Sequence, residues 1–285
     1  MYGETASADG EAAFKAHLGK TFDLDQPSTG ETVGKERSPF GIALDIRYPK
    51  ADPGALIQAA STAQAGWRAA GPRAWVGVSL EILSRLNRTS FEIAYSVMHT
   101  TGQAFMMTFQ AGGPHAQDRA LEAVVYAWDQ LRRIPAEAHW EKPQGKNPPL
   151  AMQKRFAIVP RGTGLVLGCC TFLTWNGYPG MFADLATGNA VIVKPHPGAI
   201  LPLAITVRIA RDVLREAGFD PNVVTPARHR SRRRRTRSGT GGAPGNQADR
   251  FHRQHAKRNL ARAQRTSGAS LHRKGRRESD RHRFR

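Results

Sequence analysis

The sequence predicts an α/β protein with a parallel sheet, preceded by a mainly helical part and followed by a basic segment of different composition. Three observations lead to this fold class. Residues 155–225 alternate between short apolar or β-branched runs and helical patterns, as in parallel sheets with right-handed crossovers. Residues 54–134 carry apolar side chains at helical spacing. From residue 226 onward arginine dominates and large apolar residues become scarce.

Residues 1–150 form the predicted N-terminal part, which is mainly helical. Residues 1–50 are polar and rich in glycine, threonine and aspartate, so we expect short strands and loops there, with one helix near residues 11–18. Further helices are predicted over 54–70, 78–100 (one helix or two) and 116–134. The last of them ends in two arginines, where the helix dipole favours cations, and a proline then stops it.

Residues 151–225 are expected to begin a second domain, which is built on strands. The predicted strands cover 155–160, 164–169, 190–194 and 222–225, and the predicted helices cover 178–187 and 200–217. Thr187-Gly188-Asn189 is a turn signal before the third of these strands. Gly218 follows the second helix, where glycine commonly closes a helix. The order of elements indicates a parallel sheet.

The charge of the chain is concentrated in its last 60 residues. The formal net charge is +19, and residues 226–285 hold 20 arginines and lysines against three acidic residues. Residues 1–225 therefore carry only +2, the balance of an ordinary globular protein. The tail contains no Val, Ile, Met, Trp, Tyr or Cys. It cannot bury an apolar face, so we expect residues 226–285 to be disordered.

One interpretation of the tail is a nucleic-acid-binding function. Ser231–Arg237 (SRRRRTR) could bind RNA or DNA phosphates weakly and nonspecifically through counterion release. Only Phe251 and Phe284 are available there for base stacking, which disfavours a dedicated single-strand module. This function stays open as an alternative.

The sequence carries no pattern of a disulfide framework, a metal site, a signal peptide or a membrane span. Cys169 and Cys170 are adjacent, so they suit neither a disulfide framework nor a spaced metal site. We expect two inert buried thiols in a reducing cytoplasm. His99 and His115 lack partner ligands at metal spacing, so no metal is expected. The polar, acidic start is unlike a signal peptide, and no run of about 20 apolar residues predicts a membrane span.

Residues 162–195 carry two linked motifs. Thr174-Trp175-Asn176 follows one predicted strand, and the next strand ends in Lys194-Pro195. This arrangement resembles the start of the cofactor-binding domain of aldehyde dehydrogenases. Four segments resemble more narrowly the phenylacetic acid degradation protein PaaN branch of that superfamily: YGETASADGEAAF, HTTGQAFMMTFQAGGPHAQDRALEAV, WEKPQGK and TFLTWNGYPG. The resemblance covers about residues 2–225 and implies a partial aldehyde dehydrogenase fold with the first strands of a Rossmann-like sheet.

The resemblance implies NAD- or NADP-dependent oxidation of an aldehyde to a carboxylic acid in aromatic (phenylacetate) catabolism, by a protein that forms a homo-oligomer when complete. This chemistry needs a thiolate nucleophile, donors for the oxyanion that forms, and a carboxylate base that activates water. By resemblance, Asn176 is the oxyanion donor and Lys194 reaches the adenosine ribose hydroxyls, or a 2′-phosphate in NADP. Thr174 and Trp175 lie against the cofactor.

Plainer interpretations of the same residues remain open. Asn176 could be a turn residue, Lys194 a solvated strand end and Trp175 a packing residue. His196, two positions after the strand predicted over 190–194, is expected in a loop, with a structural or solvent-facing role.

The resemblance also predicts what this chain lacks. In the family, the nucleophilic cysteine and the general-base glutamate come well after the Trp-Asn turn, whereas Cys169 and Cys170 precede it. Residues 228–285 can be back-translated into codons that the genetic code allows. When such a DNA sequence is read one base later, it can encode a Phe-Thr-Gly-Ser-Thr turn and a Glu-Lys-Ala-Gly motif, in the order that the family shows. We therefore expect a reading-frame shift near residue 226 and a truncated, inactive chain.

Overall fold

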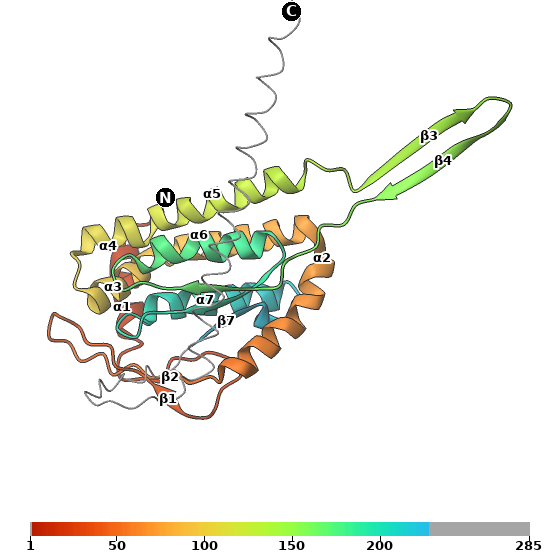
Figure 1. The fold of residues 1–285 in the computed structure, drawn as a ribbon. Helices are drawn as coiled ribbons and strands as arrows, with labels where there is room; N and C mark the ends of the chain where they lie inside the picture. The colour runs from red at the N-terminus through yellow and green to blue at the C-terminus, as the bar shows by residue number, and fades with distance from the viewer. Residues whose placement is uncertain (1, 228–285) are drawn as a thin grey trace, which may run out of the picture. The chain divides into compact units, whose positions relative to one another are not determined.

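The structure is a computed structural model that describes residues 2–227 (Figure 1). Its helices are α1 (Ala6–Lys15), α2 (Pro53–Arg88), α3 (Ser90–Thr101), α4 (Phe105–Gly112), α5 (Pro114–Leu131), α6 (Leu173–Ala186), α7 (Leu201–Glu216) and the short 3₁₀ helix η1 (Pro221–Val223). Its strands are β1 (Thr32–Val33), β2 (Tyr48–Pro49), β3 (Glu137–Gln144), β4 (Asn147–Arg155), β5 (Thr163–Leu167), β6 (Ala190–Lys194) and β7 (Val224–Pro226). The disordered tail predicted over 226–285 starts too early, because Pro226 is buried at the end of β7. The remainder of that prediction, over residues 228–285, lies outside the described residues, as does the frame shift.

The parallel sheet predicted from the sequence is present and runs in the order β5-β6-β7. Leu165 of β5 lies opposite Ile192 of β6, which lies opposite Thr225 of β7. Helix α6 connects β5 to β6, and α7 connects β6 to β7. The α/β fold class is confirmed for this part of the chain.

Strand β6 is covered on both faces, which explains its continuous apolar sequence. Val191 and Val193 face a core that includes residues of α6 and α7. Ala190 and Ile192 point the other way, into a smaller cluster with Leu56 and other residues at the start of α2. Because α6 and α7 cover one face and α2 the other, both sets of alternating side chains are buried.

Helix α2 consists of two helical arms joined at a kink, and the second arm begins earlier than the sequence predicts. Gly71 adopts φ 79° and is followed by Pro72, where the helix resumes. A positive φ favours glycine at this position. The Trp75 indole Nε1 donates to the Trp67 carbonyl at 2.6 Å, which bridges the two arms of the kink. The helix end predicted at residue 70 is therefore confirmed by the non-helical Gly71, whereas the next helix, predicted from residue 78, begins at Pro72.

A β-hairpin replaces the strand predicted over 155–160, and that prediction is wrong. Strands β3 and β4 pair antiparallel, with Trp140 opposite Met152. All their residues are exposed except Ala138, which is half-buried. The apolar run after Arg155 forms no strand, and Val159 in it is 60% exposed. A strand that buries no face need not carry an alternating apolar pattern, so the hairpin left no clear sequence signal.

Other boundaries differ by a few residues. Helix α1 begins at Ala6, earlier than expected, and the strand expected from residue 222 begins at Val224, after η1. Gly218 adopts φ 80° just after α7, as predicted. The predicted turn at Thr174–Asn176 is instead the first turn of α6, which starts at Leu173. In the part of the chain that the structure describes, no helix is long and apolar enough to cross a membrane.

Candidate functional site at the carboxyl edge of the sheet

The carboxyl ends of β5 and β6 bring the predicted site residues to one edge of the sheet. The Gly168 N–H, just after β5, donates to the Lys194 carbonyl at the end of β6, at 2.8 Å. A Cβ at position 168 would lie 2.7 Å from Leu203 Cδ1 and 3.3 Å from Pro195 Cα, so glycine permits this close approach. Ligands of open α/β sheets bind outside the carboxyl ends of the strands. The edge is therefore the candidate site.

Asn176 is exposed in the first turn of α6. Its amide Nδ2 donates to the Cys169 Sγ at 3.3 Å, across the segment that joins β5 to α6. A side-chain amide carries two N–H donors, so a second donor remains for an oxyanion. The expectation of buried, inert thiols is wrong in part: Cys169 and Cys170 are both half-buried, because they lie at the sheet edge rather than under it.

Trp175 and Thr174 precede this amide and lie in different surroundings. The Trp175 side chain is 37% exposed, and its ring lies 6.0 Å from that of His115, edge to face. The Thr174 side chain is 1% exposed and faces the end of α4 near Gly112. Trp175 thus presents an aromatic surface to a ligand, whereas Thr174 can offer little more than its backbone.

Gln103 supports the same segment, although the residue patterns did not single it out. It lies between α3 and α4, and its Nε2 donates to the Thr171 carbonyl at 2.7 Å. The bond ties the loop after α3 to the residues just before α6. Gln103 belongs to the HTTGQAF segment of the family resemblance, which is the only signal that could have pointed to it.

Lys194 is half-buried at the end of β6, and a short loop follows it. His196 in this loop is exposed, as predicted, and its Nδ1 accepts from the Gly198 N–H at 3.1 Å. The Ala199 N–H donates to the His196 carbonyl at 3.0 Å. The loop is therefore ordered by its own hydrogen bonds, and it brings a lysine and a histidine to the edge where Asn176 lies.

Asp184 is a half-buried carboxyl group on α6. Burial raises its carboxyl pKa to about 6. A Cβ at Gly164, near the start of β5, would lie within 2 Å of this carboxylate, so glycine makes room for it. Asp184 lies at the amino end of the strands, away from Asn176, and it plays no part in the candidate site.

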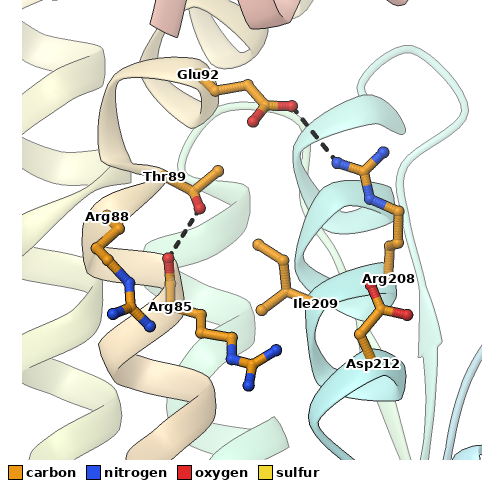
Figure 2. A pocket seen from close by; sticks show the side chains of 7 residues that line it. All are labelled: Arg85, Arg88, Thr89, Glu92, Arg208, Ile209 and Asp212. Carbon is orange, nitrogen blue, oxygen red and sulfur yellow. Dashed lines mark hydrogen bonds and ion pairs between the residues drawn. The ribbon is translucent and has the colours of Figure 1, made fainter. Parts of the chain in front are cut away.

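A separate cavity of about 390 Å³ lies between α2, α3 and α7 (Figure 2). It is lined by Arg85, Arg88, Thr89, Glu92, Arg208, Ile209 and Asp212. Hydrogen bonds to Glu216 and Glu81 raise the pKa of Arg85. Arg208 lies 3.7 Å from Glu92. Because carboxylates pair with these arginines, the cavity is not preorganised to bind an anion. None of the predicted site residues lines it.

The histidines give no indication of a metal centre. Burial lowers the pKa of His99, whose Nδ1 lies 2.9 Å from the Ser38 hydroxyl and whose ring stacks on Phe14 at 4.7 Å. Within residues 2–227, no group of three or more His, Cys, Asp or Glu side chains could hold a metal ion.

Comparison with solved structures gives the class of the protein. The chain is 86% identical to an NAD-dependent aldehyde dehydrogenase from Burkholderia multivorans, with a TM-score of 0.77, over 79% of this chain and 40% of that one. It also resembles Thermus thermophilus 1-pyrroline-5-carboxylate dehydrogenase (21% identity, TM-score 0.58, 78% of this chain and 42% of that one). The Delta-pyrroline-5-carboxylate dehydrogenase of Mycobacterium tuberculosis shows the same fold (16% identity, TM-score 0.60, 80% of this chain and 42% of that one).

A scan against protein-family models finds no match, and no curated protein matches the chain. The identity to the Burkholderia enzyme and the arrangement of the sheet show that the chain belongs to the aldehyde dehydrogenase superfamily. It spans about 40% of the length of the solved structures that it matches.

Proposed function

We propose that residues 2–227 are the cofactor-side portion of an NAD(P)-dependent aldehyde dehydrogenase of the PaaN type, which oxidises an aldehyde to a carboxylic acid in phenylacetate catabolism. One observation carries the proposal: β5 and β6 end side by side, so that the start of α6, with Trp175 and Asn176, and the end of β6, with Lys194, lie at one edge of the sheet. The Burkholderia relative is named as NAD-dependent, which favours NAD. The PaaN assignment rests on the sequence segments alone.

Asn176 is the proposed oxyanion donor. One of its amide N–H groups is held by the Cys169 sulfur, so the other is oriented before any substrate arrives. A donor oriented in advance stabilises developing negative charge without reorganisation in the transition state. Gln103 holds the preceding segment through the Thr171 carbonyl, which keeps the first turn of α6 in place.

Lys194 and Trp175 are the proposed cofactor contacts, and Thr174 contributes through its backbone. The residues present fit a dinucleotide in part: an ammonium group on a strand end suits ribose hydroxyls or a 2′-phosphate, and the exposed indole offers an apolar surface. The bound nicotinamide supplies the acceptor for a hydride. Lys194 orients the adenosine end, and Trp175 shields one side of the site from water.

Neither described cysteine is proposed as the nucleophile. Cys169 and Cys170 both precede α6 and the Trp-Asn motif that it carries. By family resemblance the nucleophile and the general base lie beyond the Trp-Asn motif. We therefore propose that residues 2–227 bind cofactor without aldehyde turnover, and that the whole enzyme is a homo-oligomer acting on a small aldehyde.

Titration calorimetry of the 285-residue chain with NAD⁺ tests the proposed cofactor contacts. We expect binding in the unaltered chain and clear weakening in Lys194→Ala. Lys154→Ala is the matched control, because it removes the same charge from the exposed strand β4. Equal affinity in all three proteins, or no binding in any, would overturn the proposal.

The basic composition of residues 226–285 favours a second candidate, nonspecific nucleic-acid binding. Phosphate binding of this kind falls steeply as salt rises, because it depends on counterion release. Titration of a single-stranded oligonucleotide at two salt concentrations separates the candidates: we expect its binding to collapse at the higher salt, and NAD⁺ binding to change little. Resequencing the gene across codons 215–300 tests the frame shift, which predicts an open frame one base later.

A further inference from the structure

A buried carboxylate joins the N-terminal part of the chain to the loop that follows Lys194. Glu36 lies between β1 and β2, and only 8% of its surface is exposed. Burial of an ionised carboxylate is costly unless hydrogen bonds satisfy its oxygens. The hydrogen-bond partners of Glu36 therefore indicate which part of the structure it stabilises.

The Glu36 carboxylate meets the N-terminus of α7. Its Oε1 accepts the backbone N–H groups of Ile200 and Leu201, the latter at 3.0 Å. Its Oε2 accepts the Tyr48 hydroxyl. Residue 200 is the N-cap of α7 and makes no side-chain cap of its own. A carboxylate from 164 positions earlier in the chain thus supplies the cap and complements the helix dipole.

These bonds hold one end of a six-residue loop whose other end is held by the sheet. Lys194 is paired in the β5–β6 ladder, and its carbonyl accepts the Gly168 N–H. Residues 195–200 then lead directly to the two amides that Glu36 binds. With both ends held, few positions remain open to the backbone of the loop, which starts at Lys194 and carries the exposed His196 ring near the carboxyl edge of the sheet.

We propose that Glu36 is a positioning residue for the cofactor-side loop, acting through the N-terminus of α7 on Lys194. The role rests on the proposed function, because it concerns the lysine that is proposed to hold the adenosine ribose. Loss of the cap makes the loop more mobile. Ligand binding must then order the loop, which costs conformational entropy, so the affinity for the ligand falls. Glu36 itself does not touch the ligand.

The test combines hydrogen exchange with binding of 5′-AMP, a probe that carries the adenosine ribose. Glu36→Gln preserves the shape of the side chain and removes its charge. The glutamine oxygen can still accept the two N–H groups, so the variant loses the interaction of the charge with the helix dipole. We expect faster amide exchange in residues 199–203 and about threefold weaker 5′-AMP binding, the factor that corresponds to loss of that interaction. Tyr48→Phe removes the hydroxyl that donates to Oε2 and leaves the carboxylate in place, so we expect a smaller change in both measurements.

Glu31→Gln is the matched control. Glu31 lies five positions earlier and pairs with Lys50 at the surface, at 2.5 Å, so its substitution leaves loop exchange and 5′-AMP affinity unchanged. Circular dichroism confirms that each variant is folded under the conditions of the assay, so that a general loss of stability is not mistaken for loss of positioning.

The outcomes separate this inference from the proposed function. If Lys194→Ala weakens 5′-AMP binding while Glu36→Gln changes neither binding nor exchange, the positioning role is wrong and the proposed function stands. If the unaltered chain does not bind 5′-AMP, the cofactor site fails, and the exchange data alone decide whether Glu36 orders the loop. Faster exchange with unchanged affinity limits Glu36 to capping α7 and overturns its role in binding.

Discussion

Strand β6 and the β3–β4 hairpin use the same backbone hydrogen bonding in opposite surroundings. In β6, Val191 and Val193 are at most 1% exposed, because helices cover both faces of the sheet. In the hairpin, Trp140 and Met152 are 42% and 45% exposed, and almost no residue of either strand is buried. The contrast shows that pairing alone defines a strand, whereas burial decides how strongly the strand stabilises the fold.

The largest expected effect comes from a charge placed in β6. Val193→Asp buries an unpaired carboxylate between α2 and the α6–α7 layer, and should cost about 4 kcal/mol or more of folding free energy. Met152→Asp makes a similar change in the exposed hairpin and should cost about 0.5 kcal/mol or less. Urea denaturation followed by circular dichroism measures both. Comparable losses in the two variants would show that the hairpin carries more stability than its exposure indicates.

The next effect concerns Asp184, whose pKa burial raises to about 6 from an ordinary value of 3.8. The folded state binds this proton more tightly than the unfolded state, so stability falls as pH rises from about 4 to about 6 and then levels off. Asp184→Asn removes that loss. We expect about 2 kcal/mol of added stability at pH 7 and almost none at pH 4.

Urea denaturation at the two pH values measures the Asp184 effect, and Asp129→Asn is its counterpart at an exposed position. Hydrogen bonds from Arg133 and Arg132 lower the pKa of Asp129, so removal of this carboxylate should not stabilise the protein at pH 7. A gain from Asp184→Asn that was the same at both pH values would exclude burial of the charge as its cause.

A smaller effect is expected at Gly168, where β5 and β6 approach each other at their ends. A Cβ there would press on the Leu203 side chain and on the backbone at Lys194 and Pro195. Gly168→Ala should cost about 1 kcal/mol, since the leucine can shift in part. It should also weaken NAD⁺ binding, because the loop after Lys194 moves. Gly145→Ala, in the hairpin turn, is the control. A Cβ added there has no neighbouring atom within 4 Å, and calorimetry should show that the NAD⁺ affinity is unchanged.

The smallest effect is expected within the hairpin itself. Arg155 and Glu137 form an ion pair at 3.4 Å, with both side chains largely exposed. Exposed pairs contribute little because water and salt screen them, so Arg155→Ala should change stability by about 0.3 kcal/mol. A thermal melt that shifted by several degrees would show that the hairpin is anchored in a way that its exposed surface does not reveal.

The candidate site was partly predictable because its motifs lie on elements with strong patterns. Lys194 ends an apolar strand, and Asn176 begins a helix, so a parallel sheet places both at one edge. The contact of Asn176 with Cys169 was not predictable, since it depends on how the five residues between β5 and α6 fold. The roles of Asn176, Thr174, Trp175 and Lys194, and the division of the chain at residue 150, stay predictions.

The sequence by itself determined the order of strands and helices from β5 to β7 and the family resemblance of residues 162–195. Those features depend on local patterns and on the two-sided burial that makes β6 continuously apolar. Only the tertiary structure decided that the second arm of α2 begins directly after Gly71, that residues 137–155 form a hairpin, and that Glu36 caps α7. The reason is physical: a kink, an exposed strand pair and a cap 164 positions away are set by packing and long-range hydrogen bonds, which no window of neighbouring residues contains.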